Sequence, residues 1–187
     1  PRGLGRGRIF PDAATATMAN LGTVSTDGVD FNVDYTRGVN ASWAQSIGFD
    51  AQLTFVNSYR QDYPIISSRE RAGTIRNGQV YPEWKANTAL TLQGRRWSAT
   101  WSTRYISSMD DFLRPPELTD DAVAEPVWYQ DVFANLDFWD FVTITVGIDN
   151  LTDEDPPRFH SSFNAETEPG YYDVIGRRLF TTFTMRF

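Results

Sequence analysis

The sequence has no cysteine, one lysine (Lys85) and one histidine (His160) among its 187 residues. The absence of cysteine excludes disulfides, thiolate metal sites and cysteine nucleophiles, and it is usual for bacterial envelope proteins. Acidic residues outnumber basic ones by 24 to 17, and the resulting net charge of −7 argues against nucleic-acid binding. We therefore expect no nucleic-acid partner, and nothing in the composition predicts a metal or a cofactor.

Long apolar runs are also missing. No segment reaches the roughly 18 apolar residues that a transmembrane helix requires. This absence does not exclude a membrane protein, because the strands of a membrane β-barrel alternate polar and apolar residues and have low average hydropathy. The chain begins at Pro1 and carries no signal peptide, so we expect either a processed chain or a fragment of a longer one.

What the sequence does contain is alternation with a period of two residues, which is typical of β-strands with one apolar face. It predicts seven strands and no convincing helix. The predicted strands are Val29–Tyr35, Ile47–Phe55, Trp84–Leu92, Trp97–Tyr105, Val132–Phe138, Val142–Ile148 and Leu179–Phe187. The predicted fold class is all-β, an antiparallel up-and-down meander.

The connections between these strands alternate in length. Short turns follow the first, third and fifth strands, whereas the long segments Tyr59–Pro82, Ser107–Pro126 and Asn150–Ile175 follow the others. An up-and-down meander places all the short turns at one end, as in bacterial outer-membrane barrels, which have short periplasmic turns and long extracellular loops. We therefore predict about seven strands of a transmembrane β-barrel.

Two further patterns agree with a barrel wall. Most tryptophans lie at or beside strand ends, where the interfaces of a membrane would be. The polar face of the strands is rich in Asp, Asn and Gln, which predicts a hydrated or plugged lumen.

The loops Ser107–Pro126 and Asn150–Ile175 each carry a net charge of −5, from six acidic residues and one arginine. Ordinary solvated loops explain this charge; divalent-cation binding and repulsion of anions are the alternatives, and no calcium-loop motif is present.

The end of the chain carries the most specific pattern. Residues 146–153, VGIDNLTD, are followed by Pro156 and Pro157, then by YDVIGRR at 172–178 and a closing amphipathic strand with a terminal Phe187. This region resembles the C-terminal end of TonB-dependent outer-membrane receptors. Members of that family commonly have Asn-Leu-Phe-Asp at the position of residues 150–153, and Thr152 replaces the phenylalanine here. Gly28 and the alternation after it are similar to another strand of that family.

The resemblance implies that residues 1–187 are the C-terminal portion of a 22-stranded barrel in the bacterial outer membrane. The plug domain, and the motif that contacts TonB, would belong to a part of the protein outside this sequence. The implied function is active uptake of a scarce nutrient such as a siderophore, cobalamin or an oligosaccharide. The implied partners are outer-membrane lipid, TonB, the barrel-assembly machinery and a small-molecule substrate.

Two sets of candidate residues follow. Gly176, Phe183, Met185 and Phe187 would form the signal that the barrel-assembly machinery recognises, because an amphipathic final strand pairs with an open sheet edge. Aromatic loop residues are weak candidates for substrate contact, with loop packing as the more ordinary interpretation. These residues are Tyr81, Phe112, Phe163, Tyr171 and Tyr172.

Other functions remain open at this point. A passive porin would show the same strands and loops, and only a plug upstream would distinguish a receptor from it. A soluble β-sandwich that binds carbohydrate would require the apolar faces to pack on each other. An enzyme is not expected, because His160 has no cysteine to pair with and Ser161 lacks the nucleophile-elbow motif. No phosphate-binding loop motif is present either.

Overall fold

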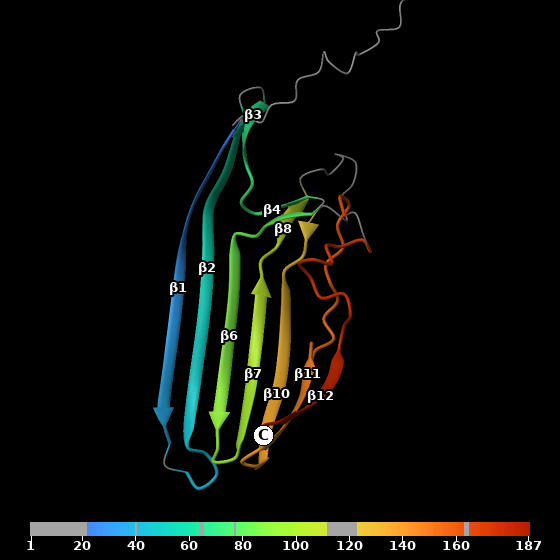
Figure 1. The fold of residues 1–187 in the computed structure, drawn as a ribbon. Helices are drawn as coiled ribbons and strands as arrows, with labels where there is room; N and C mark the ends of the chain where they lie inside the picture. The colour runs from blue at the N-terminus through green and yellow to red at the C-terminus, as the bar shows by residue number, and fades with distance from the viewer. Residues whose placement is uncertain (1–21, 40, 64–65, 77, 112–122, 163–164) are drawn as a thin grey trace, which may run out of the picture.

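The computed structural model describes residues 22–39, 41–63, 66–76, 78–111, 123–162 and 165–187. In these residues the fold is all-β, with one large antiparallel sheet whose strands follow one another in chain order (Figure 1). Within the described part of the chain, no helix is long and apolar enough to span a membrane. The strands of the large sheet are β1 (Thr23–Gly38), β2 (Ser46–Tyr63), β6 (Trp84–Gln93), β7 (Trp97–Ile106), β10 (Val127–Trp139), β11 (Val142–Asp149) and β12 (Arg178–Met185), with β3 (Ile66–Glu70) paired to β2.

All seven predicted strands are therefore confirmed, in the predicted meander order. The first, second and fifth are longer than the alternation indicated, because β1 begins at Thr23, β2 continues to Tyr63 and β10 begins at Val127. For β1 and β2 the reason is a β-bulge between Asp27 and Gly28, which shifts the register and interrupts the alternation. A Cβ at Gly28 would lie 2.3 Å from the carbonyl oxygen of Phe55, so only glycine fits at this bulge.

The sheet has a short-turn end and a long-connection end. The β1–β2, β6–β7 and β10–β11 turns all lie at one end, at the bottom of Figure 1, and the longer connections lie at the other. The predicted alternation of short and long connections is thus confirmed. Among the described residues β1 and β12 each have a strand neighbour on one side only, so the sheet is open.

The strand register aligns the apolar residues on one face of the sheet, which we call the apolar face. Residues paired across antiparallel strands point to the same side, so each lateral row of partners samples one face. One apolar row crosses all seven strands: Tyr35, Phe49, Leu90, Trp101, Val132, Ile148 and Leu179.

The neighbouring row, one residue along, lies on the opposite face, which we call the polar face. Across the first five strands this row contains Asp34, Asp50, Ala89, Ser102 and Asp131. Asp149 and Arg178 pair on the last two strands of the same face. A one-residue slip in any strand would exchange the two faces, so the register is strongly specified by this pattern.

The long connections contain structure that the sequence did not reveal. A second, smaller sheet is formed by β4 (Thr74–Arg76), β5 (Gln79–Tyr81), β8 (Met109–Asp111) and β9 (Val123–Ala124). The parallel β4–β8 pairing joins the first and second long connections. These strands have two or three residues each, too short to show alternation in the sequence.

The buried core lies at the long-connection end and joins the small sheet, the ends of β7 and β10, and the 150–177 connection. Its members are Ile75, Ile106, Met109, Ala124, Val127, Tyr129, Phe159 and Tyr172. Ile106, Val127 and Tyr129 occupy positions of the polar face, which is therefore apolar at this end. The long connections thus form a packed cap over that end of the polar face.

Candidate functional site

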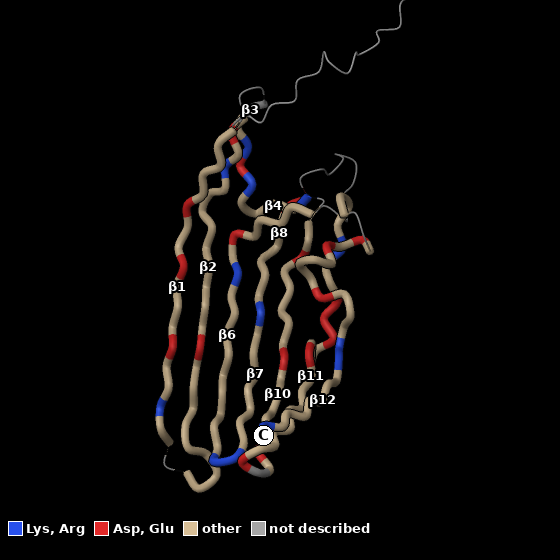
Figure 2. The backbone as a smooth tube through the Cα atoms, viewed as in Figure 1, with Lys and Arg blue, Asp and Glu red and all other residues tan. Residues whose placement is uncertain are grey.

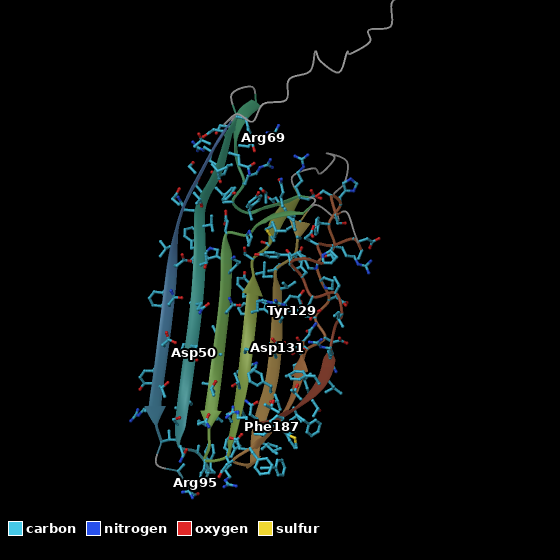
Figure 3. The ribbon with its side chains drawn as sticks, in the orientation of Figure 1. Asp50, Arg69, Arg95, Tyr129, Asp131 and Phe187 are labelled. Atoms are coloured by element: carbon cyan, nitrogen blue, oxygen red, sulfur yellow. The ribbon has the colours of Figure 1, made fainter. Side chains whose placement is uncertain are left out.

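The polar face holds an open depression of about 450 Å³ below the cap. Its charged lining comes from Asp50 on β2, Arg104 on β7, Asp131 on β10, Asp149 on β11, and Asp173 in the last connection. Four carboxylates against one guanidinium give this lining a formal charge of −3. Gln52, Asn87 and Ser102 add neutral donors and acceptors. Figure 3 places Asp50 and Asp131 on this sheet, and Figure 2 shows the acidic positions spread over its strands.

Internal hydrogen bonds fix several of these groups. The Arg178 guanidinium donates to Asp149 Oδ2, with the Nη2 atom 2.5 Å from that oxygen. Asp131 Oδ1 accepts a hydrogen bond of 2.8 Å from the backbone amide of Asn150. The Arg104 guanidinium lies 4.7 Å from the centre of the Tyr129 ring, a cation–π arrangement. The depression therefore has ordered walls, and carboxylate oxygens are the kind of acceptor that a hydroxyl or ammonium group requires.

Asn150 anchors the last connection to the sheet. Its side chain is completely buried, and its φ of 50° lies in the left-handed region that asparagine tolerates better than most residues. The side chain donates to the carbonyl of Glu154 (2.9 Å) and accepts from the amide of the same residue (2.8 Å). These reciprocal bonds close a tight turn directly after β11, and they give a structural reason for the asparagine in the VGIDNLTD segment.

The two ends of the last connection are joined beside this turn. Asp153 Oδ1 accepts a hydrogen bond of 2.8 Å from the amide of Arg177, and its Oδ2 lies 3.7 Å from the Arg177 guanidinium. Gly176 has a φ of +75°, and a Cβ there would lie 3.0 Å from Asp153 Oδ1. Gly176 is therefore required by backbone conformation and close approach, whatever else recognises it.

The second connection and the last one also contact each other. The amide of Ser161 donates a hydrogen bond of 2.6 Å to Asp111 Oδ2. The amide of Asp173 donates to the Tyr129 hydroxyl at 3.3 Å. The cap over the depression is therefore tied to β10 and to the small sheet, rather than being attached only at its ends.

The predicted substrate-contacting aromatics occupy different surroundings. Tyr172 is buried in the core with 3 % of its surface exposed, and burial raises the pKa of its hydroxyl well above the usual value. Tyr171 packs edge-on against it at 5.5 Å between ring centres, and burial raises its pKa as well. Tyr81 on β5 stacks on Tyr59 at 4.5 Å.

Loop packing is thus what the structure shows for Tyr171, Tyr172 and Tyr81, and their contact with a substrate stays a prediction. Phe112 and Phe163 lie outside the described residues.

Glu70 closes the hairpin formed by β2 and β3. Its carboxylate accepts hydrogen bonds from the Ser58 hydroxyl (2.7 Å) and from the backbone amides of Tyr59 (2.6 Å), Arg71 (3.0 Å) and Ala72 (3.1 Å). The hydrogen bond from Ser58 is the largest cause that lowers the pKa of Glu70 to about 2, with the backbone amides adding to it. The hairpin is therefore held by an ionised carboxylate.

The apolar face is bordered by aromatic side chains towards both ends. At the long-connection end, Trp84 stacks on Phe55 (4.5 Å) and Trp128 stacks on Tyr105 (4.3 Å). At the short-turn end, Trp97 opens β7. Tyr105 and Trp97 are eight residue steps apart on β7, which corresponds to about 27 Å along the strand.

Three of the four residues of the predicted assembly signal lie at the open edge, and the fourth, Gly176, lies in the connection that precedes β12. Phe183 and Met185 on β12 alternate on the apolar face, with 71 % and 64 % of their surfaces exposed, and Phe187 follows them fully exposed. This strand pairs with β11 on one side only among the described residues. An exposed amphipathic edge strand of this kind has the geometry for β-augmentation.

Sequence reasoning identified the polar face but missed how it is organised. Arg104, Asp131 and Asn150 were not singled out as site residues, because the alternation shows which face a residue occupies and not which loop returns to cover it. No group of three or more His, Asp or Glu residues that could hold a metal occurs within the described ranges.

Comparisons with protein-family models, with curated proteins and with solved structures found no match to the chain.

Proposed function

We propose that this chain is a barrel-wall and extracellular-loop segment of a TonB-dependent outer-membrane receptor. It would act in the active uptake of a scarce nutrient such as a siderophore, cobalamin or an oligosaccharide. The observation that carries the proposal is the exposed apolar face, which is continuous in register over seven strands. Large apolar side chains on it are far from buried, with Phe31 exposed by 59 %, Trp101 by 49 % and Phe183 by 71 %.

An apolar face of this extent must be covered in the working protein, because soluble monomers rarely expose contiguous apolar patches larger than a few hundred Å². Bilayer hydrocarbon is the covering that agrees with the aromatic borders. The stretch of about 27 Å between Tyr105 and Trp97 is measured along the strand and shortens when the strand tilts. It is comparable with the apolar band of about 25 Å in outer-membrane barrels.

A soluble sandwich is less well supported. It requires a second sheet packed against the apolar face, whereas the buried core in the described residues lies on the polar side of the large sheet. The small sheet contributes Ile75 and Met109 to that core. The choice of active transport over passive permeation rests on the resemblance of the VGIDNLTD and YDVIGRR segments to the receptor family.

The orientation follows from the same proposal. The short turns face the periplasm, and the cap and the depression beneath it face the cell exterior, where a solute arrives. The carboxylates of the depression then line part of the route into the barrel. Aspartate, asparagine and glutamine side chains there suit a solute rich in hydroxyl or amino groups.

The test is fractionation of the native protein, followed by its intact mass and an uptake assay. We expect it in the detergent-soluble outer-membrane fraction, with a mass several times the 21.3 kDa of this chain and with uptake that stops when TonB is removed. Recovery in the aqueous fraction would contradict the membrane proposal. Membrane localisation with solute entry independent of TonB would favour the porin.

A further inference from the structure

The short-turn end of the large sheet is basic. Arg37 lies near the end of β1, Arg95 and Arg96 form the β6–β7 turn, and Arg186 follows β12. Among the described residues of these turns and strand ends, from 37 to 45, 94 to 96, 140 to 141 and 186 to 187, the acidic residue is Asp140. Four arginines against one aspartate give the side chains of this end a formal charge of +3, whereas the charged lining of the depression sums to −3. Figure 2 shows blue Lys and Arg positions in the turns at the bottom of the view.

A cavity of about 400 Å³ is built into this end. The β1–β2 turn forms most of its wall, from Val39 and residues 41–45, and Arg95 of the neighbouring turn completes it. Two backbone hydrogen bonds hold the wall in place, from the amide of Val39 to the carbonyl of Gln45 (2.8 Å) and from the amide of Gln45 to the carbonyl of Gln93 (2.7 Å). Figure 3 shows Arg95 at this end of the sheet.

The cavity combines a cation with an aromatic side chain at the border of the apolar face. Trp43 lines it and is 61 % exposed. Arg37 pairs with Ile47 and follows Tyr35 by two residues, so it continues the apolar face of β1 at its short-turn end. An exposed tryptophan and a guanidinium placed where an apolar face ends are suited to the boundary between hydrocarbon and headgroups.

Three of these four arginines, Arg37, Arg95 and Arg186, have no ion-pair partner in the part of the chain that the structure describes. Arg96 lies 3.9 Å from Asp140 and donates to the carbonyl of Phe138, whereas Arg37 and Arg95 make no ion pair with any described carboxylate. Their guanidinium groups therefore keep their donors for a ligand. A guanidinium matches the geometry of a phosphate, which it binds through paired hydrogen bonds.

We propose that the cavity at the short-turn end, lined by Trp43 and Arg95, together with Arg37 on the adjoining end of β1, binds the phosphate headgroup of an anionic phospholipid. This inference rests on the proposed function, in which the short turns lie at the periplasmic leaflet. Charge complementarity selects an anionic lipid over a zwitterionic one, and continuity with the apolar face places the acyl chains of the lipid along β1 and β2. Basic pockets beside membrane-spanning elements bind anionic headgroups in this way.

The experiment measures lipid selectivity of the full-length native protein in phosphatidylcholine vesicles. Spin-labelled phosphatidylglycerol and spin-labelled phosphatidylcholine serve as probes, and the fraction immobilised by the protein is compared between them. We expect a preference for phosphatidylglycerol that weakens at high salt. The double variant Arg37→Gln, Arg95→Gln is expected to lose about fivefold in this preference for each arginine removed.

Matched variants separate this inference from a structural effect. Arg37→Lys with Arg95→Lys keeps the charges and is expected to retain most of the preference. Arg60→Gln removes an exposed arginine at the long-connection end of β2, where Glu70 is its partner in the strand register. This variant is expected to leave the preference unchanged. A loss of the same size in Arg60→Gln would overturn the proposal.

Other outcomes divide the two proposals. Equal immobilisation of both probes by a protein that is folded and inserted would overturn the lipid site and leave the proposed function standing. Displacement of phosphatidylglycerol from the wild-type protein by lipopolysaccharide, abolished by the same double variant, would assign the site to that lipid and overturn the inference. Failure of the native protein to insert at all would refute the proposed function and this site with it.

Discussion

Replacing Val146 with arginine tests whether the apolar face is in contact with bilayer hydrocarbon or with water. Val146 lies in the middle of β11, is 40 % exposed, and pairs with Ala134 and Thr181, which are small enough to leave room for a longer side chain. The cost of Val146→Arg is therefore mostly the cost of removing a guanidinium from water. At the midplane of a bilayer this cost is about 2–4 kcal/mol, and it falls to about 0–1 kcal/mol near the interfaces.

The matched control is the preceding residue on the same strand. Thr145 lies on the polar face, and its hydroxyl donates a hydrogen bond of 2.7 Å to Asn135 Oδ1. Thr145→Arg is expected to cost about 1 kcal/mol, because this hydrogen bond is lost while the new charge remains hydrated. Thr145→Val removes the hydroxyl without adding a charge and measures that contribution alone.

The dependence of this cost on depth in the bilayer is tested with Val142, which occupies the apolar face at the beginning of β11. Val142→Arg is expected to cost about 0–1 kcal/mol, because the guanidinium reaches the interface. The assay is reversible denaturant unfolding of the native protein in phospholipid vesicles, followed by tryptophan fluorescence. Equal costs for Val146→Arg and Thr145→Arg would refute the facing assignment. A cost at Val146 within about 0.5 kcal/mol would show a face in contact with water.

Three further substitutions test the cap, the β2–β3 hairpin and the polar face. Asn150→Ala removes the side-chain bonds of a buried residue with a positive φ and is expected to cost about 1–3 kcal/mol, measured as faster proteolysis of the last connection. Glu70→Gln is expected to abolish a pH dependence of the β2–β3 hairpin. Because the folded pKa of about 2 lies below the usual 4.5, the stabilisation is complete above about pH 4.5 and is lost as the pH falls towards 2; hydrogen exchange of the hairpin amides reports it. Gly147→Ala would place a Cβ 2.5 Å from the Phe180 ring and is expected to cost about 1–3 kcal/mol in the unfolding assay.

Two of these have a control variant in the same chain. Leu151→Ala alters an exposed neighbour of Asn150 and is expected to leave proteolysis nearly unchanged. Gly48 lies on the polar face of β2, and a Cβ added there would lie 3.6 Å from its nearest neighbour, Thr36 Oγ1. A loss of stability in Gly48→Ala equal to that in Gly147→Ala would therefore contradict the steric argument. A hairpin whose hydrogen exchange has the same pH profile with Glu70→Gln would show that the carboxylate does not hold it.

The large sheet was predictable because each strand presents its own face pattern. Val142–Ile148 and Ile47–Phe55 alternate so regularly that a period of two residues and the turn lengths determine both the strands and their order. The bulge at Gly28 was not predictable, since it breaks the alternation on which the prediction depends. The strands of the small sheet were missed because two or three residues cannot define a period.

The site was less accessible from the sequence for a similar reason. Asp50 and Asp149 were expected on the polar face, but the depression depends on where the last connection returns, and that path is determined by the contacts of Asn150 and Asp153 far from any periodic pattern. The candidate Tyr172 illustrates the limit. An aromatic residue in a loop of the sequence lies in the structure at the centre of the buried core.

The most direct test of the membrane-wall proposal is a cysteine scan along β11, from Val142 to Ile148. This stretch contains no native cysteine, so each variant carries a single label there. Nitroxide labels are attached in the native protein in its membrane, and their collision with molecular oxygen is compared with collision with a water-soluble nickel chelate. We predict that Ile144→Cys and Val146→Cys collide preferentially with oxygen, which concentrates in hydrocarbon, and Thr143→Cys and Thr145→Cys with the nickel chelate. Preferential collision with the chelate at all four positions would contradict a lipid-facing surface.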